Sequence, residues 1–135
     1  MDKKNILIKS HPENLRRVRA LMTDILSISQ ISEQDSQMIT LAIDEACSNI
    51  IKHGYKNNYN QKIDITVDLK TELLTITIID EGIKFNIHSI EPRDVSKIRP
   101  GGLGIHIIKQ VMDSVEYRQT SDGLNKVTLI KKLLP

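Results

Sequence analysis

Hydrophobic and polar residues alternate in two neighbouring stretches in the middle of the chain. Isoleucine, valine or leucine occupies every second position in KIDITVDL (62–69), and the alternation returns in LLTITII (73–79). Successive side chains of a strand point to opposite faces, so each stretch predicts a strand with one buried and one polar face. The short KTE link between them predicts a hairpin in an antiparallel sheet that is covered on one side only.

Two earlier segments have hydrophobic residues at intervals of three and four, which is the spacing of an amphipathic helix. The first follows a short apolar strand at 5–9, and Ser10 and Glu13 before it have the spacing of a capping box. The second begins after Ser32, whose hydroxyl group can cap the first turn, and it is predicted to continue to Gly54.

The second half of the chain begins with a segment that has no clear period, residues 81–100. A glycine-rich GGLG at 101–104 then opens a third predicted helix, and two closing strands are predicted around 115–118 and 126–132. The resulting order, β-α-α-β-β-loop-α-β-β, predicts the α/β class. We expect a two-layer α+β sandwich with helices on one face of a mainly antiparallel, mixed sheet.

The composition suits one globular domain that spans residues 1–135. Aromatic residues make up only 3%, which argues against base-stacking surfaces, and the net charge of +2 is not concentrated in a basic run, so no direct nucleic-acid partner is predicted. Cys47 is the one cysteine, and no apolar run approaches the roughly 20 residues of a membrane span. We therefore expect a cytoplasmic protein without a membrane partner.

Three hydrogen-bonding side chains, Glu45, Asn49 and His53, recur at intervals of four in the second predicted helix. They fall within a sector of roughly 80° that borders the apolar side. A solvated polar face is the ordinary interpretation of any one of them. Together they offer a carboxylate that can accept a proton and a neutral amide oxygen that suits a hard cation such as Mg²⁺.

Two further features carry possible chemistry. Asp80 follows the second hairpin strand and precedes Gly82; a strand-end carboxylate can accept a hydrogen bond from an exocyclic amine, and a glycine lets a flat ring approach the backbone. The glycine-rich helix start at 101–104 can bind phosphate through its backbone N–H groups. An ordinary Asp-x-Gly turn and a flexible helix start remain alternatives. Neither GxxxxGK[ST] nor GxGxxG is present, since Ile107 stands where the latter needs its last glycine.

In this order, the three features resemble the N box and the two glycine boxes of the GHKL ATPase superfamily, whose fold is the Bergerat α/β sandwich. Within it the chain most resembles the bacterial anti-sigma regulatory factors, which are serine-protein kinases of partner-switching systems. The resemblance is carried by DEACSNIIKHGY (44–55), GGLGIHIIKQVMDSVEY (101–117) and Lys126-Val127-Thr128. It implies ATP and Mg²⁺ as cofactors.

The resemblance also implies roles for single residues. Glu45 corresponds to the general base and Asn49 to the Mg²⁺ ligand, with His53 beside them at the phosphate end. Asp80 corresponds to the aspartate that binds the adenine amino group, and Gly82 to the glycine under the ring. The remaining implied positions are Thr128 near the adenine, Gly102, Leu103 and Gly104 in the second glycine box, and an ATP lid at about 84–101.

The chain departs from the family pattern in two places. Lys84 replaces the second glycine of the usual DxGxG, which stiffens the lid hinge, although its side chain can instead reach a phosphate. Gly101 stands where some relatives have a polar or basic residue, and Arg99 is close enough in sequence to substitute for it.

The implied activity is transfer of the γ-phosphate of ATP to a serine of a STAS-domain anti-sigma antagonist. The family also implies a homodimer and a sigma factor that is exchanged for the antagonist according to the nucleotide state. Two alternatives stay open. One is a nucleotide-binding module without phosphotransfer, which the Lys84 departure motivates, and the other is the detached catalytic domain of a histidine kinase.

Overall fold

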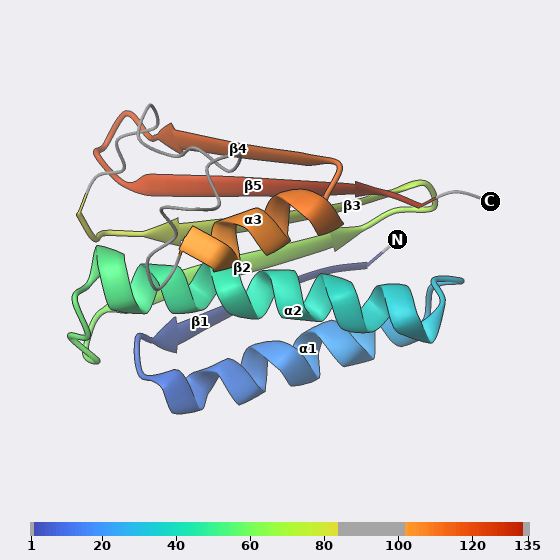
Figure 1. Cartoon of the computed structure of the whole chain (residues 1–135), viewed down its shortest axis with the longest axis horizontal. Helices are drawn as coiled ribbons and strands as arrows, with labels where there is room; N and C mark the ends of the chain where they lie inside the picture. The colour runs from blue at the N-terminus through green and yellow to red at the C-terminus, as the bar shows by residue number, and fades with distance from the viewer. Residues whose placement is uncertain (1, 84–101, 134–135) are drawn as a thin grey trace.

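The computed structural model of the chain describes residues 2–83 and 102–133 (Figure 1). Its element order confirms the predicted one. The elements are β1 (Asp2–Lys9), the 3₁₀ turn η1 (Pro12–Asn14), α1 (Leu15–Ser27), α2 (Glu33–Asn49), the π-helical turn η2 (Ile50–Gly54), β2 (Lys62–Leu69), β3 (Leu73–Asp80), α3 (Gly102–Val111), β4 (Ser114–Gln119) and β5 (Asn125–Lys132).

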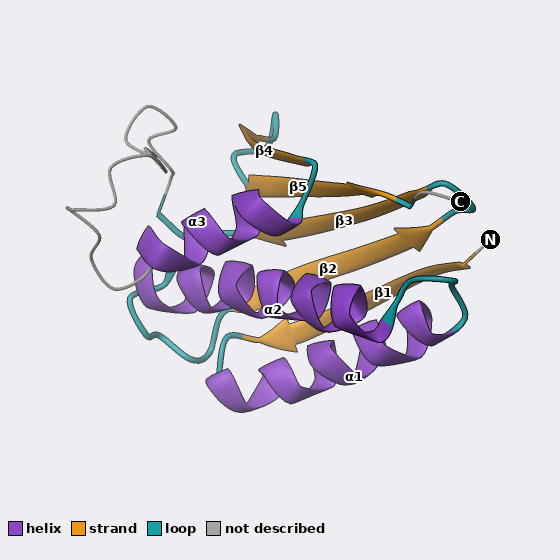
Figure 2. Ribbon diagram, turned by 45° about the vertical axis from the view of Figure 1, so that its right-hand side comes forward, coloured by secondary structure: helices purple, strands orange, loops and turns teal. Residues whose placement is uncertain are grey.

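The strands form one sheet in the order β1-β2-β3-β5-β4. Every pair of neighbouring strands is antiparallel. The prediction of a mixed sheet, which would include a parallel pair, is therefore wrong for the described strands. The helices lie together on one face of this sheet (Figure 2). The predicted two-layer sandwich of helices on a mainly antiparallel sheet is therefore confirmed.

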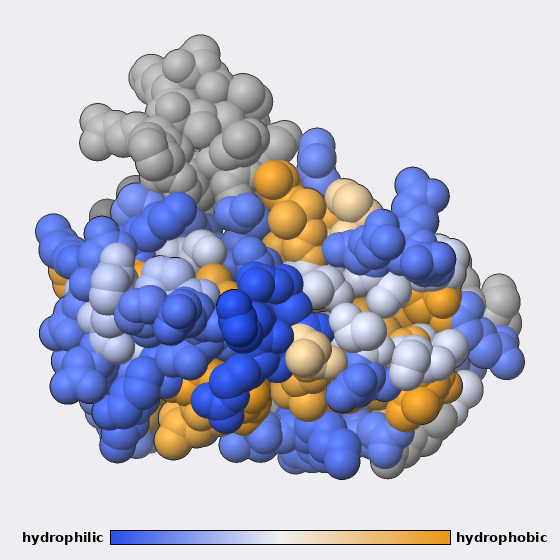
Figure 3. Space-filling view, turned by 90° about the horizontal axis from the view of Figure 1, so that it is seen from below, coloured by the Kyte–Doolittle hydropathy of each residue, from blue (hydrophilic) through white to orange (hydrophobic). Residues whose placement is uncertain are grey.

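The core lies between the helices and the inner face of the sheet. Alternate residues of β2 and β3 are buried there, and the register places Ile65 opposite Ile78 and Val67 opposite Ile76. Burying a side chain of this size contributes about 1.5–3 kcal/mol, so this alternation fixes which face the helices cover. Seen from the side of α1 and β1, the surface is mostly hydrophilic with small separate hydrophobic patches (Figure 3).

The predicted cap of α2 is confirmed, because the backbone N–H of Asp35 donates to the hydroxyl oxygen of Ser32 at 3.1 Å. The capping box predicted before α1 is wrong. Ser10 is buried, where its hydroxyl group donates to the carbonyl oxygen of Asn58 at 2.5 Å and accepts from the N–H of Gln61 at 3.0 Å. The hydroxyl group of Ser10 thus fixes a distant loop to the end of β1 and does not cap a helix.

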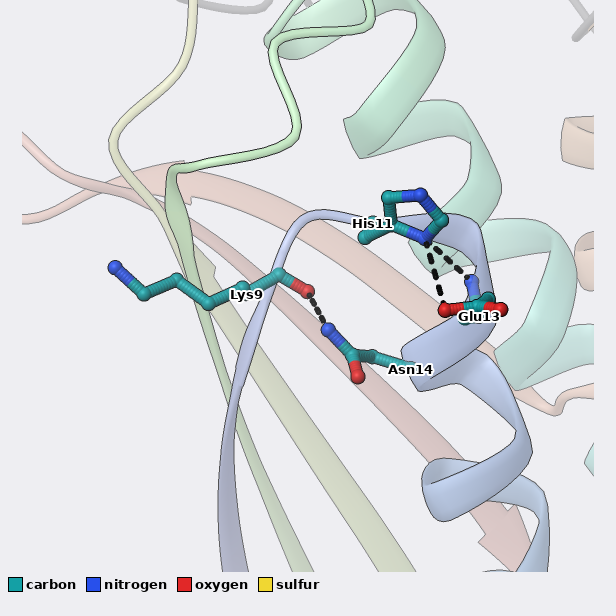
Figure 4. A network of polar contacts seen from close by, with 4 residues as sticks. All are labelled: Lys9, His11, Glu13 and Asn14. Carbon is teal, nitrogen blue, oxygen red and sulfur yellow. Dashed lines mark hydrogen bonds and ion pairs between the residues drawn. The ribbon is translucent and has the colours of Figure 1, made fainter.

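The residue that caps the turn before α1 is His11. Its Nδ1 accepts a hydrogen bond from the backbone N–H of Glu13 at 3.0 Å, and the side-chain amide of Asn14 donates to the carbonyl oxygen of Lys9 at 3.0 Å (Figure 4). Proline is favoured in the first turn of a helix, and Pro12 therefore starts the turn directly after His11.

The end of the second helix also differs from the prediction. The α-helix stops at Asn49, and the turn from Ile50 to Gly54 is π-helical, with the N–H of Tyr55 bonded to the carbonyl oxygen of Ile50 at 2.8 Å. Lys56 follows with a φ of 51°, in the left-handed region that non-glycine residues rarely adopt. Wide turns of this kind often occur at functional sites. No helix in the described ranges is both long and apolar enough to cross a membrane.

Candidate active site

Four chain segments meet at one end of the molecule, on the left in Figure 1. They are the end of α2 with its π turn, the end of β3, the start of β5 and the start of α3. The antiparallel pairing of β3 with β5 brings the last residue of one beside the first residue of the other. The second helix reaches the same end because it runs along the sheet beside these strands.

Asp80 is the last residue of β3, and only 1% of its surface is exposed. Its Oδ1 accepts hydrogen bonds from the backbone N–H of Gly82 at 2.8 Å and from the side-chain amide of Asn125 at 3.0 Å. Most buried polar groups in folded proteins are hydrogen-bonded, because an unpaired one is costly. These two bonds hold the carboxylate at the end of the strand in one orientation.

Gly82 lies directly against the backbone of the π turn. The N–H of Ile83 donates to the carbonyl oxygen of Gly54 at 2.9 Å, and a Cβ added to Gly82 would lie 2.6 Å from that same oxygen. Only glycine allows this approach. The loop after β3 is therefore packed onto the HGY segment, an association that the linear spacing of the two motifs does not reveal.

Tyr55, which follows the π turn, also bonds to the loop after β3. Its hydroxyl group accepts from the backbone N–H of Glu81 at 2.7 Å and donates to the carbonyl oxygen of Lys62 at 2.5 Å. Burial raises the pKa of the Tyr55 phenol above its ordinary value, so the hydroxyl group keeps the proton that it donates. Sequence reasoning did not identify this residue, although the HGY ending placed it beside the predicted helix end.

The β5 residue that contacts Asp80 is Asn125, and Thr128 does not lie there. The register places Asp80 opposite Asn125 and Thr77 opposite Thr128, and Asn125 is 0% exposed. Positions of opposite parity on a strand face opposite sides of a sheet. Thr128 therefore points to the side without helices. The alternation with buried Val127 would have indicated this from the sequence.

Of the three residues predicted to line one side of the second helix, only two lie in the α-helix. Glu45 and Asn49 are one helical turn apart in α2; Glu45 is partly buried and Asn49 is 9% exposed. His53 lies in the π turn and is exposed. The neighbouring carboxylate of Asp44 is engaged elsewhere, in an ion pair of 2.6 Å with Arg19 of α1. Of the two neighbouring carboxylates, Asp44 and Glu45, only Glu45 lies on the same side of α2 as Asn49.

Gly102, Leu103 and Gly104 form the first turn of α3, as the glycine-rich motif predicted. Lys84, Arg99 and Gly101 lie outside the described residues, as does the lid predicted at about 84–101. Within the described part of the chain, no cluster of three or more His, Cys, Asp and Glu residues is suited to a metal ion.

Cys47 is fully buried on α2, in the hydrophobic core. Burial, with smaller contributions from the charges of Asp44 and Asp80, raises its pKa from 9.0 to about 12. The thiolate is the reactive form of cysteine. This thiol is therefore a packing group and not a nucleophile at neutral pH.

Residues 8–131 match the family model described as the histidine kinase-like ATPase domain. The chain belongs to this family. The family is named for an ATPase domain, so membership implies the use of ATP.

Two relatives within the family are both called "Serine-protein kinase RsbW". The protein from Bacillus mycoides (strain KBAB4) is 28% identical over 123 residues, which cover 85% of this chain and 76% of the relative. The protein from Bacillus licheniformis is 27% identical over 115 residues, which cover 79% of this chain and 72% of the relative.

Solved structures support the fold. The RsbU and RsbW domains of Rv1364c from Mycobacterium tuberculosis align with a TM-score of 0.71 at 18% identity, covering 100% of this chain and 34% of that chain. One chain of the SiaB–SiaC complex from Pseudomonas aeruginosa aligns with a TM-score of 0.66 at 10% identity, covering 96% of this chain and 89% of that chain.

Proposed function

We propose that this chain is an ATP-dependent serine-protein kinase that phosphorylates a serine of a STAS-domain partner. The observation that carries the proposal is the anchored, buried carboxylate of Asp80 at the same end of the molecule as the Glu45 and Asn49 pair. A site for the adenine base at Asp80 and a site for phosphate transfer at Glu45 and Asn49, both at one end of the molecule, suit a single bound nucleotide. The serine-protein kinases among the relatives support the same activity.

The residues around Asp80 fit an adenine base. A carboxylate accepts hydrogen bonds, and the 6-amino group of adenine donates them. Gly82 has no side chain to obstruct a flat ring, and its backbone is fixed by the Ile83 bond to Gly54. The site is therefore preorganised, which lowers the entropy cost of binding.

The amide oxygen of Asn49 suits a magnesium ion. Mg²⁺ prefers oxygen ligands and usually takes only one or two from the protein. Asn49 would supply its amide oxygen, and the backbone N–H groups at the start of α3 would hold phosphate oxygens. The ion, when bound, neutralises charge that develops during transfer.

Glu45 acts on the attacking group. Its carboxylate accepts the proton of the serine hydroxyl while the oxygen–phosphorus bond to serine forms and the bond to the leaving ADP breaks. His53 lies exposed in the turn that follows and supports the phosphate end. Of the residues outside the described ranges, Lys84 and Arg99 are proposed to contact phosphate oxygens.

The partners follow from the same family. We propose a STAS-domain antagonist as substrate, a sigma factor as the alternative partner, and a homodimer as the binding unit. One neighbour of known structure is a chain of the SiaB–SiaC complex, in which two different proteins are bound to each other. A reducing cytoplasm suits the buried thiol of Cys47.

The test is incubation with radiolabelled ATP, Mg²⁺ and a candidate STAS-domain protein. We expect label on a serine, with a product that is stable in acid. Glu45→Gln should reduce the transfer rate at least about 100-fold while ADP still binds, since a general base contributes about 10²–10⁴-fold. Asp44→Asn is the matched control, because Asp44 pairs with Arg19, and it should retain activity.

Other outcomes distinguish the alternatives. Calorimetric ADP binding without label transfer, in the parent and in Glu45→Gln alike, would identify a nucleotide-binding module without kinase activity. An acid-labile, base-stable label on histidine would instead identify a histidine-kinase catalytic domain.

A further inference from the structure

The side-chain amide of Asn125 has only one possible orientation. Its nitrogen donates to Asp80 Oδ1 at 3.0 Å and to the carbonyl oxygens of Gly82 and Ile83 at 3.1 Å and 3.2 Å. All three partners are acceptors. Rotating the amide by half a turn would place its oxygen against three other oxygens, so the nitrogen must face this loop.

The fixed orientation leaves the amide oxygen of Asn125 without a hydrogen-bond partner among the described residues. The side chain is 0% exposed, so the shortage is not met at an open surface. A buried acceptor without a donor is costly and uncommon in folded proteins. Because the nitrogen of the same amide contacts Asp80, the oxygen lies close to the proposed base site.

We propose that Asn125 determines base specificity, a proposal that rests on the proposed function. Its oxygen accepts a hydrogen bond from one N–H of the adenine 6-amino group, directly or through one water molecule, while Asp80 accepts the other. Two acceptors side by side match an amino group, which has two donors. The 6-oxo group of guanine or hypoxanthine would face them as a third acceptor.

The fixed orientation of the Asn125 amide strengthens the preference for a 6-amino purine over a 6-oxo purine. A freely rotating asparagine could present its nitrogen to a 6-oxo base and so accept either purine. Here the carbonyl oxygens of Gly82 and Ile83 prevent that rotation. A site with buried hydrogen-bonding groups discriminates well against ligands that leave them unpaired.

The experiment measures dissociation constants by calorimetry for ADP, the 6-methylamino analogue of ADP, and inosine diphosphate. The parent protein should bind ADP about 3- to 10-fold more tightly than the methylamino analogue, which keeps one N–H, since one hydrogen bond is lost. Inosine diphosphate should bind at least about 100-fold more weakly than ADP.

The variant Asn125→Leu has the same shape without the acceptor. Its ratio between ADP and the methylamino analogue should fall to about one, while inosine diphosphate should gain relative to ADP. Thr128→Val, on the same strand but facing the other side, is the control and should leave all ratios unchanged. Asn125→Ala also removes the acceptor and places no oxygen against Asp80, Gly82 and Ile83, so it should lower the ratio to about one as well and provides the decisive comparison if Asn125→Leu does not fold.

An equal weakening of ADP and the methylamino analogue by Asn125→Leu would overturn the proposal, because a merely structural role affects every nucleotide alike. A parental ratio that persists in Asn125→Ala would overturn it as well. Failure of the parent to bind any nucleotide would instead refute the proposed function itself. The two failures are therefore distinguishable.

Discussion

The hydroxyl group of Tyr55 joins the residue after the π turn to the start of β2 and to the loop after β3, since it accepts from the N–H of Glu81 and donates to the carbonyl oxygen of Lys62. Tyr55→Phe removes both bonds and leaves the ring in place. We expect a loss of about 1–3 kcal/mol in the free energy of unfolding and about 3- to 10-fold weaker ADP binding, because the loop beside Asp80 is less fixed. Urea denaturation and calorimetry measure the two effects.

Tyr59→Phe is the matched control for this change. Tyr59 is exposed in the following loop, where its ring contacts the ring of His11 edge-on, so loss of its hydroxyl group should change neither quantity measurably. An unchanged ADP affinity in Tyr55→Phe would contradict the positioning role.

Gly82 and Gly54 differ sharply in their tolerance for a side chain. Gly82→Ala would place a methyl group 2.6 Å from the carbonyl oxygen of Gly54, so the loop must move. We expect destabilisation by about 1–3 kcal/mol and loss of ADP binding. Thermal denaturation with and without ADP measures both effects.

Gly54→Ala is the comparison within the same contact. A Cβ there would meet its nearest neighbours, Asp80 Oδ1 and Ile50, at 3.8 Å, which is ordinary van der Waals contact. Stability should change by less than about 1 kcal/mol and ADP should still bind. Equal effects of the two alanines would contradict the close-approach explanation.

Much of the fold was predictable because its signals are local. The period-two alternation of β2 and β3 reports a half-buried strand directly, and the hydroxyl cap of Ser32 marks the start of α2. The predictions that were wrong depended on partners far away in sequence. Ser10 had the spacing of a helix cap, but it bonds to Asn58 and Gln61 of a distant loop.

The sequence identified several residues of the candidate site by their motifs, but not which residues of other elements contact them. Asp80 and Gly82 were found by their motif, whereas Asn125 becomes visible only when the register of β3 and β5 is known. Thr128 was preferred because of the family resemblance, although strand parity turns it to the other face. The π turn was missed because its single wide turn leaves the hydrophobic spacing of the helix almost unchanged.

The cap of α2 offers a stability test that is remote from the candidate site. Ser32→Ala removes the hydrogen bond to the N–H of Asp35 and should cost about 1 kcal/mol of unfolding free energy. Ser27→Ala, at the end of α1, removes only a bond to a carbonyl oxygen within its own helix and should cost less than about 0.5 kcal/mol. Neither variant should alter ADP affinity, because both serines lie at the opposite end of the molecule; a change in affinity would show that the helix cap and the site are coupled.

Stability should fall as the solution becomes alkaline, and Cys47 should account for part of the fall. In the unfolded chain its thiol ionises with a pKa near 9.0, but in the folded chain only near 12, so between these values the folded state holds the proton more tightly. The unfolding free energy therefore decreases as pH rises from about 9, by up to about 1.4 kcal/mol per pH unit for one group. Urea denaturation from pH 7 to 11 in a reducing buffer should show a shallower decrease for Cys47→Ala than for the parent. Tyr117, whose pKa burial raises from 10.0 to about 12, contributes a similar decrease that begins near pH 10 and persists in the variant. Identical pH dependence in the two proteins would show that Cys47 ionises equally in the folded and unfolded chains, contrary to its burial.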